Sequence, residues 1–320
     1  MAPALSILIV SYNTREMTLA CLASIAAETP DLDCEVIVFD NASTDGSVGA
    51  IAAAHSGVRL IAHPENIGFA RANNLAAKEA KGKQILLLNP DTVVLDRAVE
   101  RLVSFSAEHP DALIWGGRTV FADGRLNPTS SYAAPTLWSL SCFALTLGRL
   151  APRSAWLNPE FTSLRHDGEE RDVDIVTGCF LLIGRETWEQ LGGFDPDYFL
   201  YGEETDLCLR AKVLGARPRI TPKATIVHHV GAAAAARADK IERGFQGKVT
   251  LAVKHWGPVR ATLARGLLRL TVLMRWGGYA LAARLRRRDA HRTAAAEWRE
   301  AWARRATWLA GYPPAPPGYR

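Results

Sequence analysis

Short apolar runs alternate with segments of helical pattern over the first 115 residues. The expected strands are residues 5–10, 35–39, 58–62 and 84–88. The expected helices follow them, at residues 14–28 with Thr14 as N-cap, then one ending near Ala50, then 69–80 and 96–108. Continuous β-rich runs that are each followed by a helix are typical of a parallel sheet covered on both faces. The pattern therefore predicts a doubly wound, mostly parallel α/β fold with helices on both faces.

The pattern changes after residue 115. Residues 117–172 carry turn residues and one uncharged apolar run, so we expect an irregular insertion with one short helix. Regular patterning returns with a strand-like run at 173–184, a helix at 186–191, an acidic segment and a strand at 224–228. After Gly231 the chain is rich in Ala and Arg and helical in pattern. The predicted domains are 1–235, in halves 1–115 and 116–235, a basic helical region at 236–310, and a disordered Pro-rich tail at 311–320.

Charge is unevenly distributed along the chain. Residues 237–320 hold 18 Lys or Arg against 5 Asp or Glu, whereas residues 1–236 hold 20 against 28. A basic region suits nucleic acid, an anionic membrane or simple solubility, and the count does not choose among them.

A run of apolar residues recurs at helical spacing within the basic region. Its members are Leu263, Leu267, Leu270, Met274, Leu281 and Leu285, interspersed with Arg265, Arg269, Arg275 and Arg284 to Arg288. Arginines inside the span argue against a transmembrane helix, whereas an interfacial helix would turn them toward anionic lipid. The alternative is that these side chains pack against the rest of the protein.

Cysteine usage and the N-terminal residues bear on the compartment. The five scattered cysteines include no C-x-x-C pair, which argues against a disulfide framework and a zinc site. No basic segment precedes the first apolar run, so we expect no signal peptide. The expected location is the cytoplasm, with peripheral association at the inner face of the cell membrane if the basic helix binds lipid.

Polar residues follow each of the four predicted strands. They are Ser11, Tyr12 and Asn13; Asp40 and Asn41; residues 64–68; and Asn89, Pro90 and Asp91. Ligands of doubly wound sheets bind where the carboxyl ends of the strands meet. Asp40 could accept the ring N–H of a uracil or thymine base, or it could cap a turn. Asp91 could bind a divalent cation that bridges diphosphate oxygens, or it could belong to an Asn-Pro turn.

Residues 64–74, PENIGFARANN, follow the third strand and begin a helix. A helix N-terminus suits phosphate or ribose oxygens. Gly68 would allow close approach of the backbone, and Asn66 and Asn73 would be donors. The chain has neither a G-x-G-x-x-G nor a G-x-x-x-x-G-K-[ST] motif, so we expect no dinucleotide site and no P-loop.

An aromatic run meets a carboxylate cluster in GGFDPDYFLYGEETDLCLR. On a helix, Glu203 and Asp206 share a face while Glu204 projects beside it. The cluster indicates either a shaped pocket or acidic residues that merely suit the first turn of a helix. His228 and His229 follow the last predicted strand and point to opposite faces, so only one can enter a site. An imidazole there could bind a metal or contact a diphosphate, or it could be structural.

Together, VSYN, VFDNASTDG, NIGFARANN, LLNPDT, GGFDPDYFLYGEETDLCLR and His-His-x-Gly resemble glycosyltransferase family 2, particularly its bacterial rhamnosyltransferase-like branch. The resemblance covers about residues 4–232. It implies a GT-A fold, a nucleotide diphosphate sugar donor, Mg²⁺ or Mn²⁺, and direct displacement with inversion at the anomeric carbon. On this resemblance, Asp40 recognises the base, Asp91 is the metal carboxylate and Glu204 is the catalytic base.

From the strand ends, the helix N-terminus, the acidic cluster and the resemblance together, the expected nucleotide-sugar contacts are Ser11, Tyr12, Asn13, Asp40, Asn66, Gly68, Phe69, Asn73 and Asn89. The expected metal ligands are Asp91, His228 and His229, and the expected catalytic group is Glu204 with Glu203 and Asp206. The sequence departs from the family pattern at two places. The D-x-D position of the family reads Asn89-Pro90-Asp91 here, so Asn89 is not expected to be an equal ligand. A Glu203-Glu204 pair replaces the usual Glu-Asp, which leaves open which carboxylate acts. Glu203 and Asp206 are expected to raise the pKa of the base.

The expected function is therefore metal-dependent, inverting transfer of a sugar from a dTDP- or UDP-sugar to a hydroxyl of a cell-surface glycan or lipid-linked saccharide. The branch favours rhamnose, and residues 117–172 are expected to decide the acceptor. No nucleic-acid partner is expected. One alternative is a nucleotidyltransferase acting on sugar phosphates, although SYNTRE is not the Gly- and Arg-rich loop it would be expected to carry after the first strand. The other is a non-catalytic glycan- or membrane-binding relative, against which the carboxylates at 40, 91 and 204 argue.

Overall fold

A computed structural model describes residues 3–229, 237–286 and 288–319, which form two compact units. Unit 1 comprises Met1–Ala134, Phe161–Asp195 and Glu203–Ala233, and unit 2 comprises Pro135–Glu160, Pro196–Gly202 and Ala234–Arg320. The expected boundary at 235 lies outside the described residues. The segments 135–160 and 196–202 belong to unit 2, whereas the sequence pattern had assigned them to the first domain.

Unit 1 contains all the strands that the structure describes. These are β1 (Leu5–Ser11), β2 (Cys34–Asn41), β3 (Arg59–His63), β4 (Gln84–Leu88), β5 (Thr92–Val94), β6 (Ile114–Val120), β7 (Ser131–Tyr132), β8 (Arg171–Asp172), β9 (Ile175–Val176), β10 (Phe180–Gly184) and β11 (Arg219–His228). Its helices are α1 (Arg15–Glu28), α2 (Ser47–Ala54), α3 (Phe69–Glu79), α4 (Ala98–Glu108), α6 (Arg185–Leu191) and α7 (Glu203–Val213), with 3₁₀ turns at Pro110–Ala112 and Thr162–Leu164.

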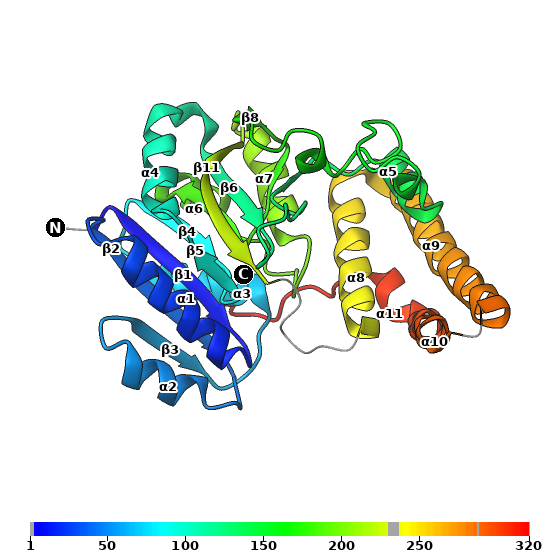
Figure 1. Cartoon of the computed structure of the whole chain (residues 1–320), viewed down its shortest axis with the longest axis horizontal. Helices are drawn as coiled ribbons and strands as arrows, with labels where there is room; N and C mark the ends of the chain where they lie inside the picture. Colours follow the sequence, from blue (N-terminus) through cyan, green and yellow to red (C-terminus); the bar gives the residue numbers. More distant parts are fainter. Residues whose placement is uncertain (1–2, 230–236, 287, 320) are drawn as a thin grey trace. The chain divides into compact units, whose positions relative to one another are not determined.

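The central sheet is mixed but mostly parallel, which confirms the predicted class. Its strand order is β3-β2-β1-β4-β10-β6-β11-β5, with β8 paired to β11 (Figure 1). Strands β3, β2, β1 and β4 run parallel to their neighbours, β10 runs antiparallel between β4 and β6, and β6 and β11 are again parallel. The carboxyl ends of β1, β2, β4, β6 and β11 therefore lie along one edge of the sheet.

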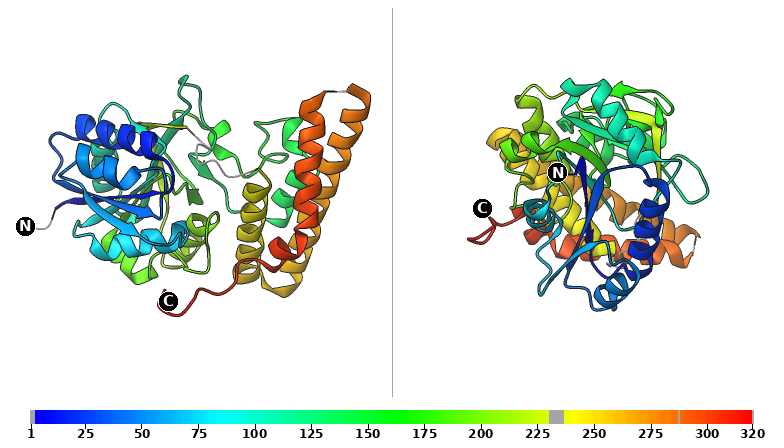
Figure 2. Two further views of the ribbon diagram at one scale, coloured as in Figure 1. Left: turned by 90° about the horizontal axis from the view of Figure 1, so that it is seen from below. Right: turned by 90° about the vertical axis from the view of Figure 1, so that its left-hand side faces the viewer.

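The alternation of side chains along β1 explains how the sheet is covered. Leu5, Ile7 and Ile9 point to one face and join a core with Leu22 of α1 and Ile51 of α2. Figure 2 shows α1 and α2 on this face and α3 on the opposite one. Burial of each such aliphatic side chain contributes about 1.5–3 kcal/mol, so a strand buried on both faces is strongly specified.

The predicted helices and strands up to residue 108 agree with the structure to within a few residues, but β6 was not predicted. Its glycines weaken the strand pattern in the sequence, yet they have a packing role. A Cβ at Gly117 would lie 2.2 Å from the carbonyl oxygen of Ala224 on β11, and one at Gly116 would lie 2.4 Å from Val176. Glycine inside a strand often marks such a close approach. Because β6 crosses residue 115, the structure does not divide unit 1 there.

Unit 2 is helical. Its elements are α5 (Leu137–Ala144), α8 (Arg237–His255), α9 (Gly257–Arg286), α10 (Asp289–Ala303) and α11 (Arg305–Ala310), with a 3₁₀ turn at Leu147–Arg149. Phe245, Leu268, Trp298 and Trp308 are among the residues of its own hydrophobic core. The short helix expected in the insertion is α5. The part of the basic helical region at 231–236 lies outside the described residues. Over the described ranges, no helix is both long and apolar enough to cross a membrane.

The Pro-rich tail differs from the expected disorder. Residues 311–319 form no regular element, but the Tyr312 hydroxyl lies within hydrogen-bonding distance of the carbonyl oxygens of Leu200 and Arg243. The amide of Ala315 donates to Asp197 at 2.7 Å. These contacts lie within unit 2 and hold the described part of the tail against it, which a proline-rich composition does not reveal.

Candidate active site

Asp40 is the next-to-last residue of β2 and is almost completely buried. Its Oδ1 accepts a hydrogen bond from the amide of Ser43 at 2.9 Å, so the turn-capping role considered from the sequence is present. Its Oδ2 has no hydrogen-bond partner among the described residues. A buried carboxylate oxygen without a donor is costly, and a ligand N–H would satisfy it. Asp40 can therefore both cap the turn and bind a ligand.

Asn41, the last residue of β2, forms hydrogen bonds with the loop that precedes α3. Its side-chain oxygen accepts from the amide of Ile67 at 2.9 Å, and its amide nitrogen donates to Asn66 Oδ1 at 3.1 Å. Asn66 Oδ1 also accepts from the amide of Gly68. Gly68 has a positive φ of 85° and precedes the first turn of α3. Asn41 and Asn66 thus fix the loop that aims the N-terminus of α3.

Three other predicted contacts have their side chains engaged elsewhere. The Ser11 hydroxyl is buried in a network with Thr14 and Thr18, which replaces the expected side-chain cap of α1. Asn13 accepts from the amide of Thr44 at 2.8 Å and so joins two strand-end loops. Asn73 is buried and donates to the carbonyl of Phe69 inside α3. These residues organise the loops, whereas Tyr12 is exposed.

Asp91 and His228 meet at the carboxyl end of the sheet. His228 pairs in register with Thr92 of β5, which places His228 Nε2 3.4 Å from Asp91 Oδ1. Both side chains are largely buried. His229 is exposed, and its amide donates to the carbonyl oxygen of Asp91 at 2.9 Å. The alternation along β11 therefore turns His228, not His229, toward the carboxylate.

The imidazole of His228 is electrostatically perturbed. Burial by itself disfavours the charged ring, but the neighbouring Cys179 and Asp91 outweigh it and raise the pKa of His228 to about 10. In the metal-free protein the ring therefore carries a proton and pairs with Asp91. A cation bound between the two residues would have to displace that proton, because only a neutral imidazole is a metal ligand.

The three clustered carboxylates of α7 have different surroundings. Asp206 is buried and forms an ion pair with Arg210, with Nε 2.7 Å from Oδ2. Arg210 also donates to the carbonyls of Leu191 and Gly193 at the end of α6. Asp206, expected to share in catalysis, thus holds α7 against α6. Arg210 was not singled out from the sequence, although its i+4 spacing from Asp206 on a helix was a usable signal.

Glu204 lies near Phe69 across Gly178. A Cβ added at Gly178 would lie 3.6 Å from Glu204 Cβ and 3.8 Å from Phe69 Cε1. The next residue, Cys179, accepts a hydrogen bond from the amide of Asn89 through its carbonyl oxygen. The segment 178–179 therefore joins the α7 carboxylates to the end of β4. Nothing in the sequence pointed to this segment as part of the site.

Glu203 is buried, and its Oε2 has no hydrogen-bond partner within the described ranges. Burial, followed by the neighbouring Glu204 and Asp206, raises the pKa of Glu203 well above its ordinary 4.5. The folded protein consequently keeps a proton that the unfolded chain releases above about pH 4.5. The contribution of Glu203 to the free energy of unfolding must therefore fall as the pH rises from about 4.5 through the raised pKa of this side chain.

Glu203→Gln should remove this pH dependence, because glutamine resembles the protonated side chain but does not titrate. We expect the stability of the variant relative to wild type to grow by up to about 1.4 kcal/mol per pH unit between about pH 5 and pH 8. Chemical denaturation across that range measures it, with the exposed Glu16→Gln as a control. Parallel curves for wild type and Glu203→Gln would contradict a protonated Glu203.

The residues around Asp91 suit a divalent cation that is bound partly by the protein and partly by a diphosphate. No group of three or more His, Cys, Asp or Glu side chains suitable for a metal occurs among the residues described. Asp91 and His228 supply two adjacent ligand atoms, and the buried Oδ1 of Asn89 lacks a hydrogen-bond partner within the same residues. Mg²⁺ is commonly held by one or two protein carboxylates together with phosphate and water. The donor set therefore suits a cation shared with a diphosphate, not a structural metal.

Asp40 and Asn89 lie on either side of β1. Ser11 pairs with Asp40, and Leu8 pairs with Leu87, so Asn89, two residues after Leu87, lies about one residue short of the level of Asp40 along the strands. Two strand spacings separate them, or about 10 Å. A nucleoside diphosphate is long enough to reach from a base contact at Asp40 to a cation at Asp91.

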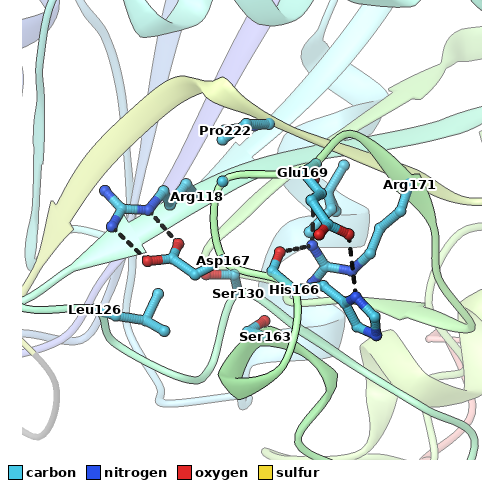
Figure 3. Close-up of a pocket in the computed structure, with 11 residues that line it drawn as sticks. Arg118, Leu126, Ser130, Ser163, His166, Asp167, Glu169, Arg171 and Pro222 are labelled. Atoms are coloured by element: carbon cyan, nitrogen blue, oxygen red, sulfur yellow. Dashed lines mark hydrogen bonds and ion pairs between the residues drawn. The ribbon is translucent and has the colours of Figure 1, made fainter.

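A hollow on unit 1 is not lined by these residues. Figure 3 shows its lining, which includes Arg118, Asp167, His166, Glu169 and Arg171. Arg118 forms a two-pronged ion pair with Asp167, at 2.5 and 2.9 Å, and Glu169 lies 3.1 Å from the His166 ring. Arg171 donates to the carbonyl oxygens of His166 and Glu169, and none of the predicted site residues lines this hollow.

The sequence is similar to known proteins over much of its length. Residues 6–192 match the family described as Glycosyl transferase family 2. The N-acetylglucosaminyl-diphospho-decaprenol L-rhamnosyltransferase of Mycobacterium tuberculosis is 28% identical over 240 residues, which are 72% of this chain and 77% of that protein. The O-antigen biosynthesis protein RfbC of Myxococcus xanthus is 28% identical over 265 residues, which are 80% of this chain and 20% of that protein.

Solved structures show the same fold at low sequence identity. The mannosyltransferase PcManGT from Pyrobaculum calidifontis, in complex with GDP-Man and Mn²⁺, has a TM-score of 0.58 at 19% identity and covers 96% of this chain and 88% of its own. GalNAc-T7 with UDP, GalNAc and Mn²⁺ has a TM-score of 0.57 at 14% identity, covering 88% and 51%. These likenesses establish a GT-A architecture, as the sequence predicted.

Proposed function

The chain belongs to glycosyl transferase family 2, and from this premise we propose that it transfers rhamnose from a dTDP-sugar to a hydroxyl of a lipid-linked saccharide or growing glycan. It is a nucleotide-sugar-dependent glycosyltransferase of the rhamnosyltransferase-like branch. To this family-level function the proposal adds rhamnose as the sugar, thymine as the base and Mg²⁺ or Mn²⁺ as the cofactor. It also adds inversion at the anomeric carbon and a location at the inner face of the cell membrane. Family membership also decides against the nucleotidyltransferase alternative.

One observation carries the proposal: Asp91 and His228 are paired at the strand ends, on the same edge as the unsatisfied oxygen of Asp40. Asp91 and His228 would hold the cation, which supplies charge compensation for the departing diphosphate. Asp40 Oδ2 would accept the ring N–H of the base. The loop fixed by Asn41 would present the N-terminus of α3 to the phosphates or ribose.

Glu204 would act on the acceptor. Its carboxylate accepts the proton of the acceptor hydroxyl while the hydroxyl oxygen bonds to the anomeric carbon and the bond to the diphosphate breaks. No covalent intermediate with the protein is needed, and attack from the face opposite the leaving group inverts the centre. Burial and the neighbouring carboxylates disfavour the ionised form of Glu203, which favours Glu204 as the base.

The identity of the sugar rests on similarity. The M. tuberculosis relative is named an L-rhamnosyltransferase with a diphospho-decaprenol-linked acceptor, and it aligns with 72% of this chain. A thermal-shift screen of dTDP-rhamnose, dTDP-glucose, UDP-glucose and GDP-mannose, each with Mn²⁺ and with a chelator, tests the assignment. Stabilisation by dTDP-rhamnose that needs Mn²⁺ is expected. A larger metal-dependent shift with another donor would replace rhamnose.

Asp40→Asn separates base recognition from turn capping. Loss of a hydrogen bond to a charged group costs about 1.5–3 kcal/mol, so the KM for the donor should rise roughly 10- to 150-fold with little change in kcat. The matched control is Asp45→Asn in the same loop, because Asp45 accepts from Ser47 and from the amide of Arg15. That variant should lose stability but keep its donor KM. An unchanged KM in Asp40→Asn, with lowered stability, would leave Asp40 as a turn cap alone.

A further inference from the structure

Helix α9 exposes a long apolar stripe. Its members, each between 37% and 75% exposed, are Val259, Leu263, Leu270, Leu273, Met274, Leu281 and Leu285. At 3.6 residues per turn they fall on one side of the helix, and the stripe is about 39 Å long. The opposite side, with Ala264, Leu268 and Val272, is buried in the core of unit 2. Of the leucines singled out from the sequence, only Leu267 joins that core as a partly buried residue.

The charge of α9 is all of one sign. The helix contains six arginines and no acidic residue, from Gly257 to Arg286. Arg260 and Arg269 are exposed and flank the stripe on the helical wheel, and the exposed Arg284 lies within the span of the stripe. An apolar surface of this size on a soluble domain marks an interaction site. The flanking cations require a partner whose surface is both apolar and anionic.

We propose that this face of α9 docks on an anionic lipid membrane, with the leucines in the headgroup boundary and the arginines at lipid phosphates. This deepens the proposed function, since a lipid-linked acceptor would be presented at that surface. A second copy of the chain fits poorly, because a symmetric contact through α9 would bring arginines against arginines. A spanning helix is excluded by the hydropathy of the described helices.

If α9 lies along the bilayer surface, two contributions to the binding free energy can be stated. Apolar insertion and attraction to anionic lipid act together, so binding should need both the stripe and the negative lipid. Each arginine near the surface should contribute roughly fivefold in affinity at low ionic strength, and salt should weaken that part.

The test is sedimentation of the full-length protein with vesicles of phosphatidylcholine alone or with phosphatidylglycerol. Wild type should bind the anionic vesicles at low salt and lose affinity as salt rises. Leu281→Gln/Leu285→Gln should bind roughly tenfold or more weakly. The matched control Val213→Gln/Val253→Gln changes two equally exposed apolar residues on α7 and α8, and it should bind like wild type. Arg260→Gln/Arg269→Gln should lose the preference for anionic lipid.

Several outcomes would overturn the proposal. Wild type that ignores anionic vesicles, or a stripe variant that binds like the control, rejects the membrane as partner. A large drop in Tm for the stripe variant shows that the chain itself covers the stripe. A dimer that the stripe variant converts to monomer, seen by light scattering, identifies a second copy instead. The vesicles contain no saccharide, so these results are independent of sugar transfer, which donor-induced thermal shifts in the same variants report separately.

Discussion

Glu204→Gln is expected to lower the rate of sugar transfer roughly 10²- to 10⁴-fold while donor affinity stays nearly unchanged. Glutamine preserves the size and reach of the side chain but cannot accept the proton of the acceptor hydroxyl. Removal of a general base costs about 3–5 kcal/mol in the barrier. The proposed base and metal contacts are Asp40 and Asp91, so the donor should bind as before. Steady-state kinetics with donor titrations measure kcat and KM separately.

Glu203→Gln is the control for this prediction. The structure buries Glu203 and raises its pKa, so the glutamine variant should retain most of its turnover near neutral pH. Turnover of Glu204→Gln within a few-fold of wild type, together with a nearly inactive Glu203→Gln, would move the base assignment to Glu203.

Asp91→Asn is expected to weaken metal-dependent binding of a nucleoside diphosphate by on the order of 10- to 100-fold or more, since even outer-shell changes at metal sites have effects of this size. The substitution removes a charged oxygen ligand and keeps the size of the side chain. It also removes the carboxylate that faces His228. Calorimetry of dTDP binding with and without Mn²⁺ measures the effect.

Asn89→Ala supplies the comparison for Asp91→Asn. Asn89 is in the same turn, and its side-chain oxygen is neutral, so its loss should matter less than the loss of the carboxylate. Metal-free binding should be similar in both variants and in wild type. If both variants bound dTDP and Mn²⁺ like wild type, the cation could not be bound at this turn.

The sequence predicted β1 to β4 and their helices because each of these strands is a nearly continuous apolar run between helical segments. It failed where packing rather than pattern decides. Gly116 and Gly117 conceal β6, although close approach to β11 requires them. The strand-like run at 173–184 is split into β9 and β10 by a turn at residues 178–179. The tail at 311–319 is held by the hydrogen bond from the Tyr312 hydroxyl to the carbonyl oxygen of Leu200, which could not be predicted from its proline-rich composition.

Site residues at strand ends were predictable for a topological reason, since parallel strands bring their carboxyl ends to one edge. Asp40, Asp91 and His228 were predicted in this way, and the structure places Asp91 beside His228. Side-chain partners were not predictable from position alone. Ser11 and Asn73 were also predicted from their positions, but Ser11 forms a hydrogen bond with Thr18 and Asn73 donates to the carbonyl of Phe69. Asp206 forms an ion pair with Arg210. Gly178 lies beside Glu204, and this proximity could be seen only in the tertiary structure.

Release of nucleoside diphosphate from dTDP-rhamnose tests the central claim most directly. The measurement uses the full-length protein with Mn²⁺, with a chelator, and with Glu204→Gln, alongside other nucleotide sugars. The account predicts metal-dependent release of dTDP by wild type, its abolition by the chelator, and a decrease of at least 10²-fold in Glu204→Gln. Folded wild type that releases no diphosphate from any nucleotide sugar, or release that is indifferent to both the chelator and the Glu204 substitution, would contradict it.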